Sequence, residues 1–281
     1  MSLTSLTSAL QHLTISHPPT SQDSQLTFAL EHLTISHPPA SQLTIPTTTM
    51  AFIRPFEPKD TEACKQICIA TLPPSLLAAR DPLVRTLAPY LWTLPFTTLS
   101  PSTCLVLDDG AGAAVGYCIG CADVYDLERR WPEYVSTVLA REIPAPKQMD
   151  ELEPWLLPNG EINAAHLVQK AWGVKWLVME DAKALGGEWR GMMHVDILEG
   201  WQGTGWGRKL VHGFLGAVAA ACVASPLGED TVDCGKGVYL GVSPENTKVV
   251  GFYERLGWRV WEREEGSEGV TMVRDFWPEG W

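Results

Sequence analysis

The sequence predicts a mixed α/β domain that begins near Phe52, and three observations support this prediction. From Phe52 onward, short apolar strands alternate with amphipathic helices. The segment "GMMHVDIL" alternates apolar and polar side chains, which is typical of a strand with one face toward a core. After the glycine-rich turn that follows, apolar residues recur every four positions along a helix, namely Leu210, Phe214, Val218 and Cys222. With 281 residues, of which 45% are hydrophobic, the chain can bury such a core.

The segment that precedes this domain carries a tandem repeat. "LQHLTISHPPTSQ" begins at Leu10 and "LEHLTISHPPASQ" begins at Leu30. Two copies are too few for a solenoid, and the Ser, Thr and Pro content predicts a weakly structured tail over residues 1–50, followed by one domain over 51–281. One alternative stays open, because three leucines have the spacing of a helical stripe that would dock on the domain or on a second copy, as in a homodimer. They are Leu26, Leu30 and Leu33.

The first half of the domain shows the following elements. "FIRPF" is a strand, and "DTEACKQICIATL" is a helix for which Asp60 or Thr61 serves as the cap. Residues 73–101 contain six prolines among apolar residues, which predicts short helices and loops. "TCLVLDDGAGAAVGYCIGCADV" reads as strand, turn and strand, because "DDGAG" supplies the glycines that a hairpin needs.

The second half continues the alternation. Residues 126–190 contain at least one helix, "NAAHLVQKAWGVKWLVMEDAKAL". "GVYLGVS" is a strand, and "NTKVVGFYERLGW" is a helix whose apolar stripe runs to Leu256, with Gly257 at the left-handed position that ends helices. Residues 258–261 and 270–276 are expected to form a closing hairpin.

The charge of the chain argues against two classes of partner. Its 21 Lys and Arg against 33 Asp and Glu give a net charge of −12, which repels nucleic acid and anionic membranes and mildly favours a cationic substrate such as an amine. No apolar run has the length of a membrane span, and the amino terminus lacks the basic start and apolar core of a signal peptide. We therefore expect a cytoplasmic or nucleocytoplasmic protein.

The seven cysteines are odd in number and lie in apolar stretches. This pattern predicts buried, reduced thiols rather than a disulfide framework. The alternative is a zinc site formed by four thiolates, those of Cys64, Cys68, Cys118 and Cys121. However, positions three apart on a strand point to opposite faces, so we expect no metal there.

The stretch "WQGTGWGRKL" has the composition of a phosphate-binding turn. A turn of small residues that leads into a helix leaves backbone N–H groups unpaired at the positive end of the helix dipole. Glycines at 203, 205 and 207 allow close approach of an anion, and Arg208 and Lys209 add positive charge. The spacing fits neither the dinucleotide fingerprint nor the nucleotide P-loop. A plain flexible turn remains the alternative.

The run Gln202-Gly203-Thr204-Gly205-Trp206-Gly207 resembles the Q/R-x-x-G-x-G/A pyrophosphate loop of the GNAT acyl-CoA N-acyltransferases. Downstream, Asn246 through Phe252-Tyr253 to Gly257-Trp258 resembles a second motif of that superfamily. The resemblance covers about 52–276. Within the superfamily, "LVLDDGAGAAVGYCIGCADVYD" and "HVDILEGWQGTGWG" are most similar to the acetyltransferase-like domain of O-GlcNAcase and its free-standing bacterial relatives.

This resemblance implies a central mixed, mostly antiparallel sheet flanked by helices. It also implies an N-acetyltransferase that binds acetyl-CoA and an amine acceptor in a ternary complex, with direct attack of the amine on the thioester. Animal members of the closest group are thought to have lost the cofactor loop, so a non-catalytic acyl-CoA-binding or interaction module is the alternative. The acceptor stays open among a small amine, a peptide amino terminus and a protein lysine.

The resemblance further implies roles for individual residues. Tyr253 is the general acid for the leaving thiolate, or else only packs in the core, and Asn246 reaches the cofactor or only caps its helix. Backbone groups near Ile197 and Leu198 pair with the cofactor's arm and stabilise the oxyanion. The residues expected to bind the cofactor are Ile197, Leu198, Gln202, Gly203, Thr204, Gly205, Trp206, Gly207, Arg208, Asn246, Phe252 and Tyr253.

The acid–base candidates lie on the strand before the loop. Asp196 is the preferred general base, because it lies six residues before Gln202 on the strand expected to carry the cofactor. His194 shares its face and would assist or replace it. Asp123 and Tyr125, just after the "GYCIGC" strand, are expected to contact the acceptor amine.

Overall fold

The computed structural model describes residues 50–223, 234–262 and 269–276. These belong to a compact unit that spans Thr47–Trp281. The predicted tail with its tandem repeat, apart from Met50, lies outside the described residues. None of the described helices is long and apolar enough to cross a membrane.

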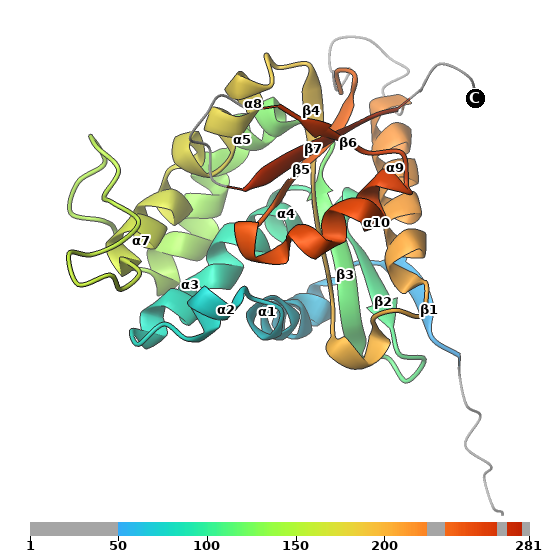
Figure 1. Ribbon diagram of the computed structural model, residues 1–281, viewed down its shortest axis with the longest axis horizontal. Coiled ribbons are helices and arrows are strands. Elements are labelled where there is room, and N and C mark those ends of the chain that lie inside the picture. Colours follow the sequence, from blue (N-terminus) through green and yellow to red (C-terminus); the bar gives the residue numbers. More distant parts are fainter. Residues whose placement is uncertain (1–49, 224–233, 263–268, 277–281) are drawn as a thin grey trace, which may run out of the picture. The chain divides into compact units, whose positions relative to one another are not determined.

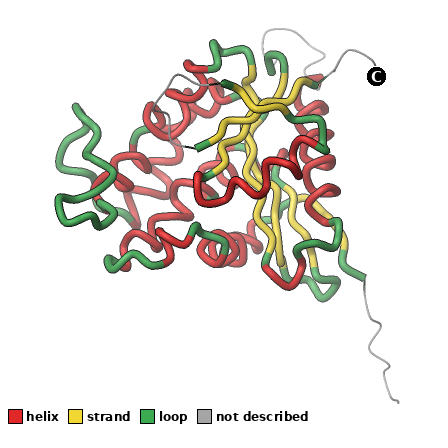
Figure 2. The backbone as a smooth tube through the Cα atoms, viewed as in Figure 1, coloured by secondary structure: helices red, strands yellow, loops and turns green. Residues whose placement is uncertain are grey.

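A seven-stranded sheet forms the centre of the domain, in the order β1-β2-β3-β4-β5-β7-β6 (Figures 1 and 2). Neighbouring strands are antiparallel except for β4 and β5, which are parallel. The strands are β1 (Phe52–Pro55), β2 (Leu105–Asp108), β3 (Ala114–Cys121), β4 (Trp189–Ile197), β5 (Gly237–Val242), β6 (Arg259–Trp261) and β7 (Val270–Asp275). The sheet confirms the predicted mixed, mostly antiparallel α/β architecture and both hairpins.

Helices cover both faces of the sheet. One face carries α1 (Thr61–Ala70), α2 (Pro74–Leu77), α3 (Pro82–Trp92), α4 (Leu94–Leu99), α5 (Val124–Tyr134), α6 (Ala140–Glu142), α7 (Ala164–Trp172) and α8 (Glu180–Ala184). The other face carries α9 (Trp206–Val223) and α10 (Val250–Glu254). Shorter turns are η1 (Pro58–Asp60), η2 (Pro101–Thr103), η5 (Glu199–Trp201) and η6 (Pro244–Val249), and η3 (Val135–Leu139) and η4 (Lys175–Met179) are π-helical.

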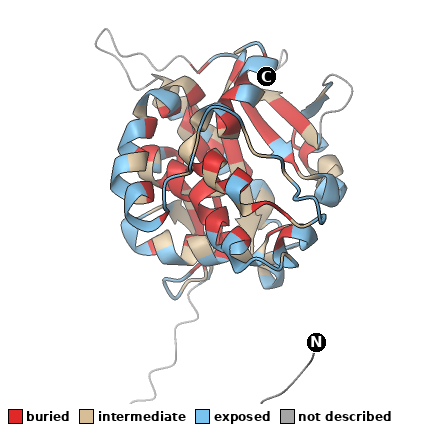
Figure 3. Cartoon of the chain, turned by 90° about the vertical axis from the view of Figure 1, so that its left-hand side faces the viewer, coloured by how far each residue is buried: buried red, intermediate tan, exposed pale blue. Residues whose placement is uncertain are grey.

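Two apolar clusters, one on each face, make up the core. Figure 3 shows how far each described residue of the domain is buried. Met193, Val195 and Ile197 of β4 pack in the cluster under α9, as the alternating pattern predicts. His194 and Asp196 point to the opposite face, toward the layer of α1 to α8. Both faces of β4 are thus covered, and the two polar side chains are half-buried rather than exposed.

Two sequence expectations about helix ends need correction. The single helix predicted within 163–185 is divided, because α7 ends at Trp172 and Gly173 has extended backbone angles before the π-helical turn η4. Asp60 occupies the N-cap position of α1, as predicted, but its carboxylate makes no capping hydrogen bond to the helix. It is buried and accepts hydrogen bonds from Arg54 at 2.7 and 2.8 Å, and the Arg54 Nε donates to Asp108 at 2.9 Å. This ion cluster ties β1 to β2 and to η1.

The cysteine prediction is correct in part. Five thiols are free and buried, and Cys118 and Cys121 lie in different apolar clusters, as expected for strand positions three apart. Cys222 and Cys234, however, form a disulfide that joins the end of α9 to the residues before β5. The expectation that all seven thiols are reduced is therefore wrong. The spacing gave no sign of this pair, because the contact depends on how α9 packs against the sheet.

Candidate active site

The sheet opens between its two parallel strands. The ladder of β4 with β5 ends at Met192 and Tyr239, whereas the ladder of β3 with β4 continues to Gly116 and Ile197. In Figure 1, β5 and β7 run obliquely to β2 and β3. The last residues of β4 therefore have a strand neighbour on one side only.

The register identifies which backbone groups face this opening. The Leu198 N–H donates to Val115 at 3.0 Å, and residues of an antiparallel pair alternate in the side to which their N–H and C=O point. The backbone groups of Asp196 are thus directed at β3, and those of Val195 and Ile197 are directed at the opening. The Ile197 carbonyl accepts the Gln202 side-chain amide at 2.7 Å. The Leu198 carbonyl accepts the Trp201 N–H at 2.8 Å.

The glycine-rich loop lies between η5 and α9 and is exposed. Gly203 and Gly205 have φ of 73° and 91°, a left-handed conformation that other residues rarely adopt. A Cβ at either position would meet no atom within 4 Å, so the backbone angle rather than crowding requires glycine. The Thr204 hydroxyl donates to the Trp201 carbonyl at 2.7 Å. As in any α-helix, the first N–H groups of the long helix α9 have no acceptor within the helix itself.

Helix α10 packs against the start of α9. A Cβ on Gly207 would lie 3.2 Å from the Phe252 ring, so the two helices approach closely at this glycine. Tyr253 is buried, with its ring 5.1 Å from Phe252 and 5.8 Å from Trp258. Burial raises the pKa of Tyr253, and the nearby Cys118 and Asp196 raise it further. Its phenol is therefore protonated at neutral pH.

Asp196 lies on the opposite face of β4 from the apolar cluster under α9. Its Oδ2 accepts a hydrogen bond of 2.5 Å from the hydroxyl of Tyr117 on β3, and the two residues are directly paired in the ladder. Burial raises the pKa of Asp196, whereas His194, Tyr117 and Thr71 act to lower it. The carboxyl therefore gains a proton at a higher pH than an ordinary aspartate does.

His194 lies two residues before Asp196 on the same face. Burial lowers its pKa, and the charge of Asp196 opposes this effect. The ring centroid lies 6.4 Å from that of Phe96 on α4. The imidazole is therefore neutral at pH 7 and can accept a proton, as a base must.

A cavity of about 660 Å³ adjoins these two side chains. It lies between the layer of α1 to α8 and the ends of β4, β5 and β7. Its apolar wall includes Trp92, Phe96 and Trp155, and its polar lining includes Thr71, Ser75, His166, Lys170, Asp181, His194, Asp196 and Glu245. Three acidic residues and one lysine thus line this space, a composition that suits a cationic ligand with an apolar portion.

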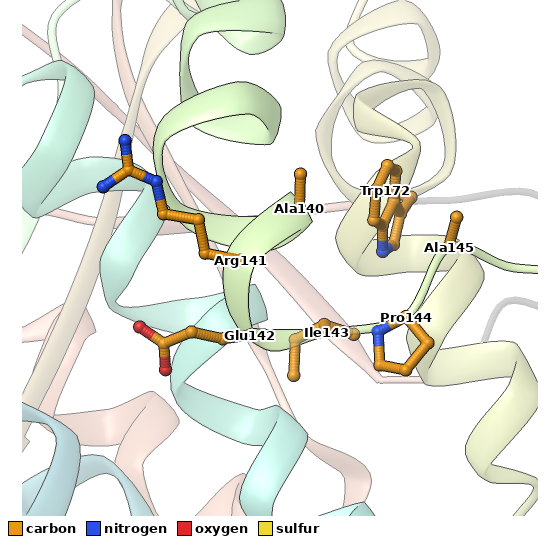
Figure 4. A pocket seen from close by; sticks show the side chains of 7 residues that line it. All are labelled: Ala140, Arg141, Glu142, Ile143, Pro144, Ala145 and Trp172. Carbon is orange, nitrogen blue, oxygen red and sulfur yellow. The ribbon is translucent and has the colours of Figure 1, made fainter.

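A second, smaller hollow of about 320 Å³ lies at the end of α6, beside Trp172 (Figure 4). Arg141 and Glu142 extend to one side of it, and Trp172 stands on the other. Glu142 already accepts a hydrogen bond of 2.5 Å from the Tyr90 hydroxyl. No residue of the β4 face or of the glycine loop lines this hollow, so it is separate from the opening at the end of β4.

Several expected site residues lie elsewhere. Asp123 caps α5 by accepting the Tyr125 N–H at 3.0 Å, and the Tyr125 ring stacks on Arg190 at 4.9 Å. Neither Asp123 nor Tyr125 lines the cavity. Asn246 is exposed within η6, whose cap is Ser243, and has non-helical backbone angles. Their predicted contacts with acceptor or cofactor stay predictions.

Sequence reasoning missed the residues that complete the site. Tyr117 was part of an expected strand, but its pairing with Asp196 depends on a register between distant segments. Thr71, Trp92 and Phe96 come from the proline-rich stretch and its borders, which carried no motif. Their apolar or hydroxyl side chains resemble ordinary core residues, so only the fold could reveal them.

Comparison of the sequence with models of known protein families finds no match. Among solved structures, SsHAT has a TM-score of 0.64 at 24% identity, and the match covers 82% of this chain and 100% of SsHAT. A GNAT superfamily phosphinothricin acetyltransferase from Sinorhizobium meliloti, solved with acetyl-CoA, matches with a TM-score of 0.40 at 11% identity, covering 80% of this chain and 88% of its own. The NatC complex bound to Gag peptide and CoA matches with a TM-score of 0.40 at 12% identity. This match covers 80% of this chain and 98% of the matched chain.

Proposed function

We propose that this chain, whose fold is that of the GNAT acetyltransferases, is an acetyl-CoA-dependent N-acetyltransferase that acts on an amine. The observation that carries the proposal is the position of the opening between β4 and β5. The glycine loop lies at the end of β4 on one side of it, and the cavity with Asp196 lies on the other. A donor and an acceptor could therefore meet across the end of β4.

The residues present fit the donor. Its pyrophosphate would lie on the loop of Gln202 to Gly205 and the first N–H groups of α9, where nothing crowds Gly203 or Gly205. Its extended arm would pair with the backbone of Val195 and Ile197, as a further strand would. From the sequence, Leu198 was expected to pair with this arm, but the Leu198 N–H and C=O are both hydrogen-bonded within the chain. In the proposal Val195 pairs with the arm instead.

When bound, acetyl-CoA supplies an acetyl group activated as a thioester. An acceptor ammonium loses two protons on becoming an amide. One must leave before the nitrogen attacks the thioester, and the second leaves as the N–C bond forms and the C–S bond breaks, replacing the proton that the thiolate takes up. In the proposal Asp196 takes the proton from the amine, with His194 as the neighbouring base. Tyr253 gives its proton to the departing thiolate, because its raised pKa keeps the phenol protonated.

The acceptor enters the cavity on the α1 to α8 side. The carboxylates of Asp181, Asp196 and Glu245 attract an ammonium group, and the indoles of Trp92 and Trp155 contact its apolar portion. The volume of about 660 Å³ admits a small amine or the tip of a lysine side chain. A cavity of this size favours an acceptor amine that is carried on an unbranched aliphatic chain.

The experiment combines calorimetry with a thiol-release assay across a panel of amines. We expect acetyl-CoA to bind and free thiol to appear only when an amine is present. Asp196→Asn should leave the affinity for acetyl-CoA nearly unchanged and lower turnover by about a hundredfold or more, since it removes the base but keeps the shape.

Two results would contradict this proposal. If acetyl-CoA does not bind at millimolar concentration, the chain is not an acetyltransferase of this kind. If it binds but no amine yields free thiol, the alternative of a non-catalytic acyl-CoA-binding module is favoured.

A further inference from the structure

Tyr117 stands behind the proposed base and does not face the ligand. It is fully buried at the centre of β3 and is not among the residues that line the cavity, whereas Asp196 is. Its hydroxyl donates to the Asp196 Oδ2 at 2.5 Å. Tyr117 therefore reaches the reaction only through this carboxylate.

A second buried hydroxyl lies within hydrogen-bond distance of the Tyr117 phenol. The Thr93 Oγ1 lies 3.4 Å from the Tyr117 hydroxyl and is itself fully buried where α3 meets α4. Because the phenol uses its single hydrogen toward Asp196, the Thr93 hydroxyl is the donor to the phenol oxygen. A chain of hydrogen bonds thus runs from the helical layer through β3 to the carboxylate on β4.

The titratable groups around Asp196 come from several elements. His194 lies beside it on β4, Tyr117 and Cys118 lie on β3, and Cys68 of α1 lies on the cavity side. Tyr253 of α10 also interacts with its charge. Burial raises the pKa values of both cysteines, so their thiols stay neutral near pH 7. Tyr117 is thus the titratable group that donates a hydrogen bond directly to the charged carboxylate.

We propose that Tyr117 is a positioning residue, which fixes the Asp196 carboxylate toward the cavity and stabilises its ionised form. This inference rests on the proposed function, in which Asp196 is the general base. A hydrogen bond to an ionised group stabilises that form against the protonated one. Without the phenol, the half-buried carboxylate would hold its proton to higher pH and would lose its fixed orientation.

The test substitutes Tyr117→Phe and compares it with Tyr134→Phe. Tyr134 is an apt control, because it is also fully buried and its hydroxyl donates to the backbone carbonyl of Tyr90 at 2.8 Å. We expect Tyr117→Phe to move the acid limb of the pH–rate profile up by about one to two pH units. We also expect kcat to fall about tenfold or more, with KM for acetyl-CoA within about twofold of wild type. Tyr134→Phe should leave the profile unmoved.

A second readout does not depend on activity. The carboxyl ¹³C resonance of Asp196 can be identified because it is missing from the spectrum of the Asp196→Asn variant. Its titration with pH gives a midpoint for the wild type and for Tyr117→Phe. An equal midpoint in both would overturn the inference, whether or not the protein acetylates an amine. Absence of acetyl transfer by wild type would instead overturn the proposed function alone. If Tyr117→Phe does not fold, Thr93→Val should shift the midpoint in the same direction by a smaller amount, and no shift there would overturn the inference.

Discussion

Gly203 and Gly205 differ from the neighbouring Gly200 in backbone angle alone. All three are exposed, and an added Cβ would meet nothing at any of them, but only Gly203 and Gly205 have positive φ. Alanine in the left-handed conformation costs about 1 to 2 kcal/mol. We expect Gly203→Ala to weaken acetyl-CoA binding by about tenfold in calorimetry, because the loop relaxes away from the shape that holds an anion. Gly200→Ala is the control, and equal affinities for the two variants would contradict the role of the loop conformation.

The sequence placed His194 and Asp196 on one face, because alternation along a strand depends only on neighbouring residues. It did not find Tyr117, whose contact with Asp196 joins residues 79 positions apart. Likewise, Asp60 has the identity and position of a helix cap, but its carboxylate accepts hydrogen bonds from the half-buried guanidinium of Arg54 instead. Side-chain partners set by tertiary contacts are therefore the part of the site that local patterns cannot predict.

The strands and helix α9 beside the site were predicted well, because each has a clear apolar period. The less accurate predictions concern irregular helices. The stretch 246–256 was expected to be one helix, whereas η6 and α10 meet at Val249 and Val250, with a kink at Asn246. Kinks have local causes that the spacing of apolar residues does not record.

The turn η6 also makes a contact across the cavity that no pattern indicated. The Ser75 N–H on α2 donates to a Glu245 carboxylate oxygen at 3.0 Å, and the Ser75 hydroxyl donates to the other oxygen. Both residues line the cavity and are exposed. This contact therefore joins the acceptor side of the site to the turn that precedes α10.

We expect Glu245→Ala to release α2 without destabilising the domain. The variant removes both acceptors of an exposed contact, so amide exchange within α2 should become faster while the thermal midpoint changes by at most about 2 °C. Hydrogen exchange read by mass spectrometry measures this. Glu254→Ala, which removes an exposed glutamate of α10, is the matched control. Equal exchange rates within α2 in the two variants would show that the contact does not hold this helix.

We expect the bond between Cys222 and Cys234 to contribute to the stability of the whole domain. This disulfide joins residues 12 positions apart, one in the last turn of α9 and one shortly before β5, two elements on which the proposed donor site depends. Closing such a loop restricts the unfolded chain and is worth about 3 kcal/mol. Because β5 is a central strand of the seven-stranded sheet, the loss should affect the cooperative unfolding of the entire domain.

We therefore expect reduction by dithiothreitol, or the double substitution Cys222→Ala and Cys234→Ala, to lower the thermal midpoint by roughly 6 to 12 °C. Calorimetric unfolding measures the midpoint, and titration of free thiols under denaturing conditions counts the cysteines that remain paired. The five other cysteines are free and buried, so dithiothreitol should not alter the midpoint of the double variant. The contrary result is a wild-type protein whose free-thiol count rises by two in dithiothreitol while its thermal midpoint stays the same. This would show that the disulfide constrains the unfolded chain too weakly to change the stability of the domain. In that case the packing of α9 against the sheet would alone hold the end of this helix beside β5.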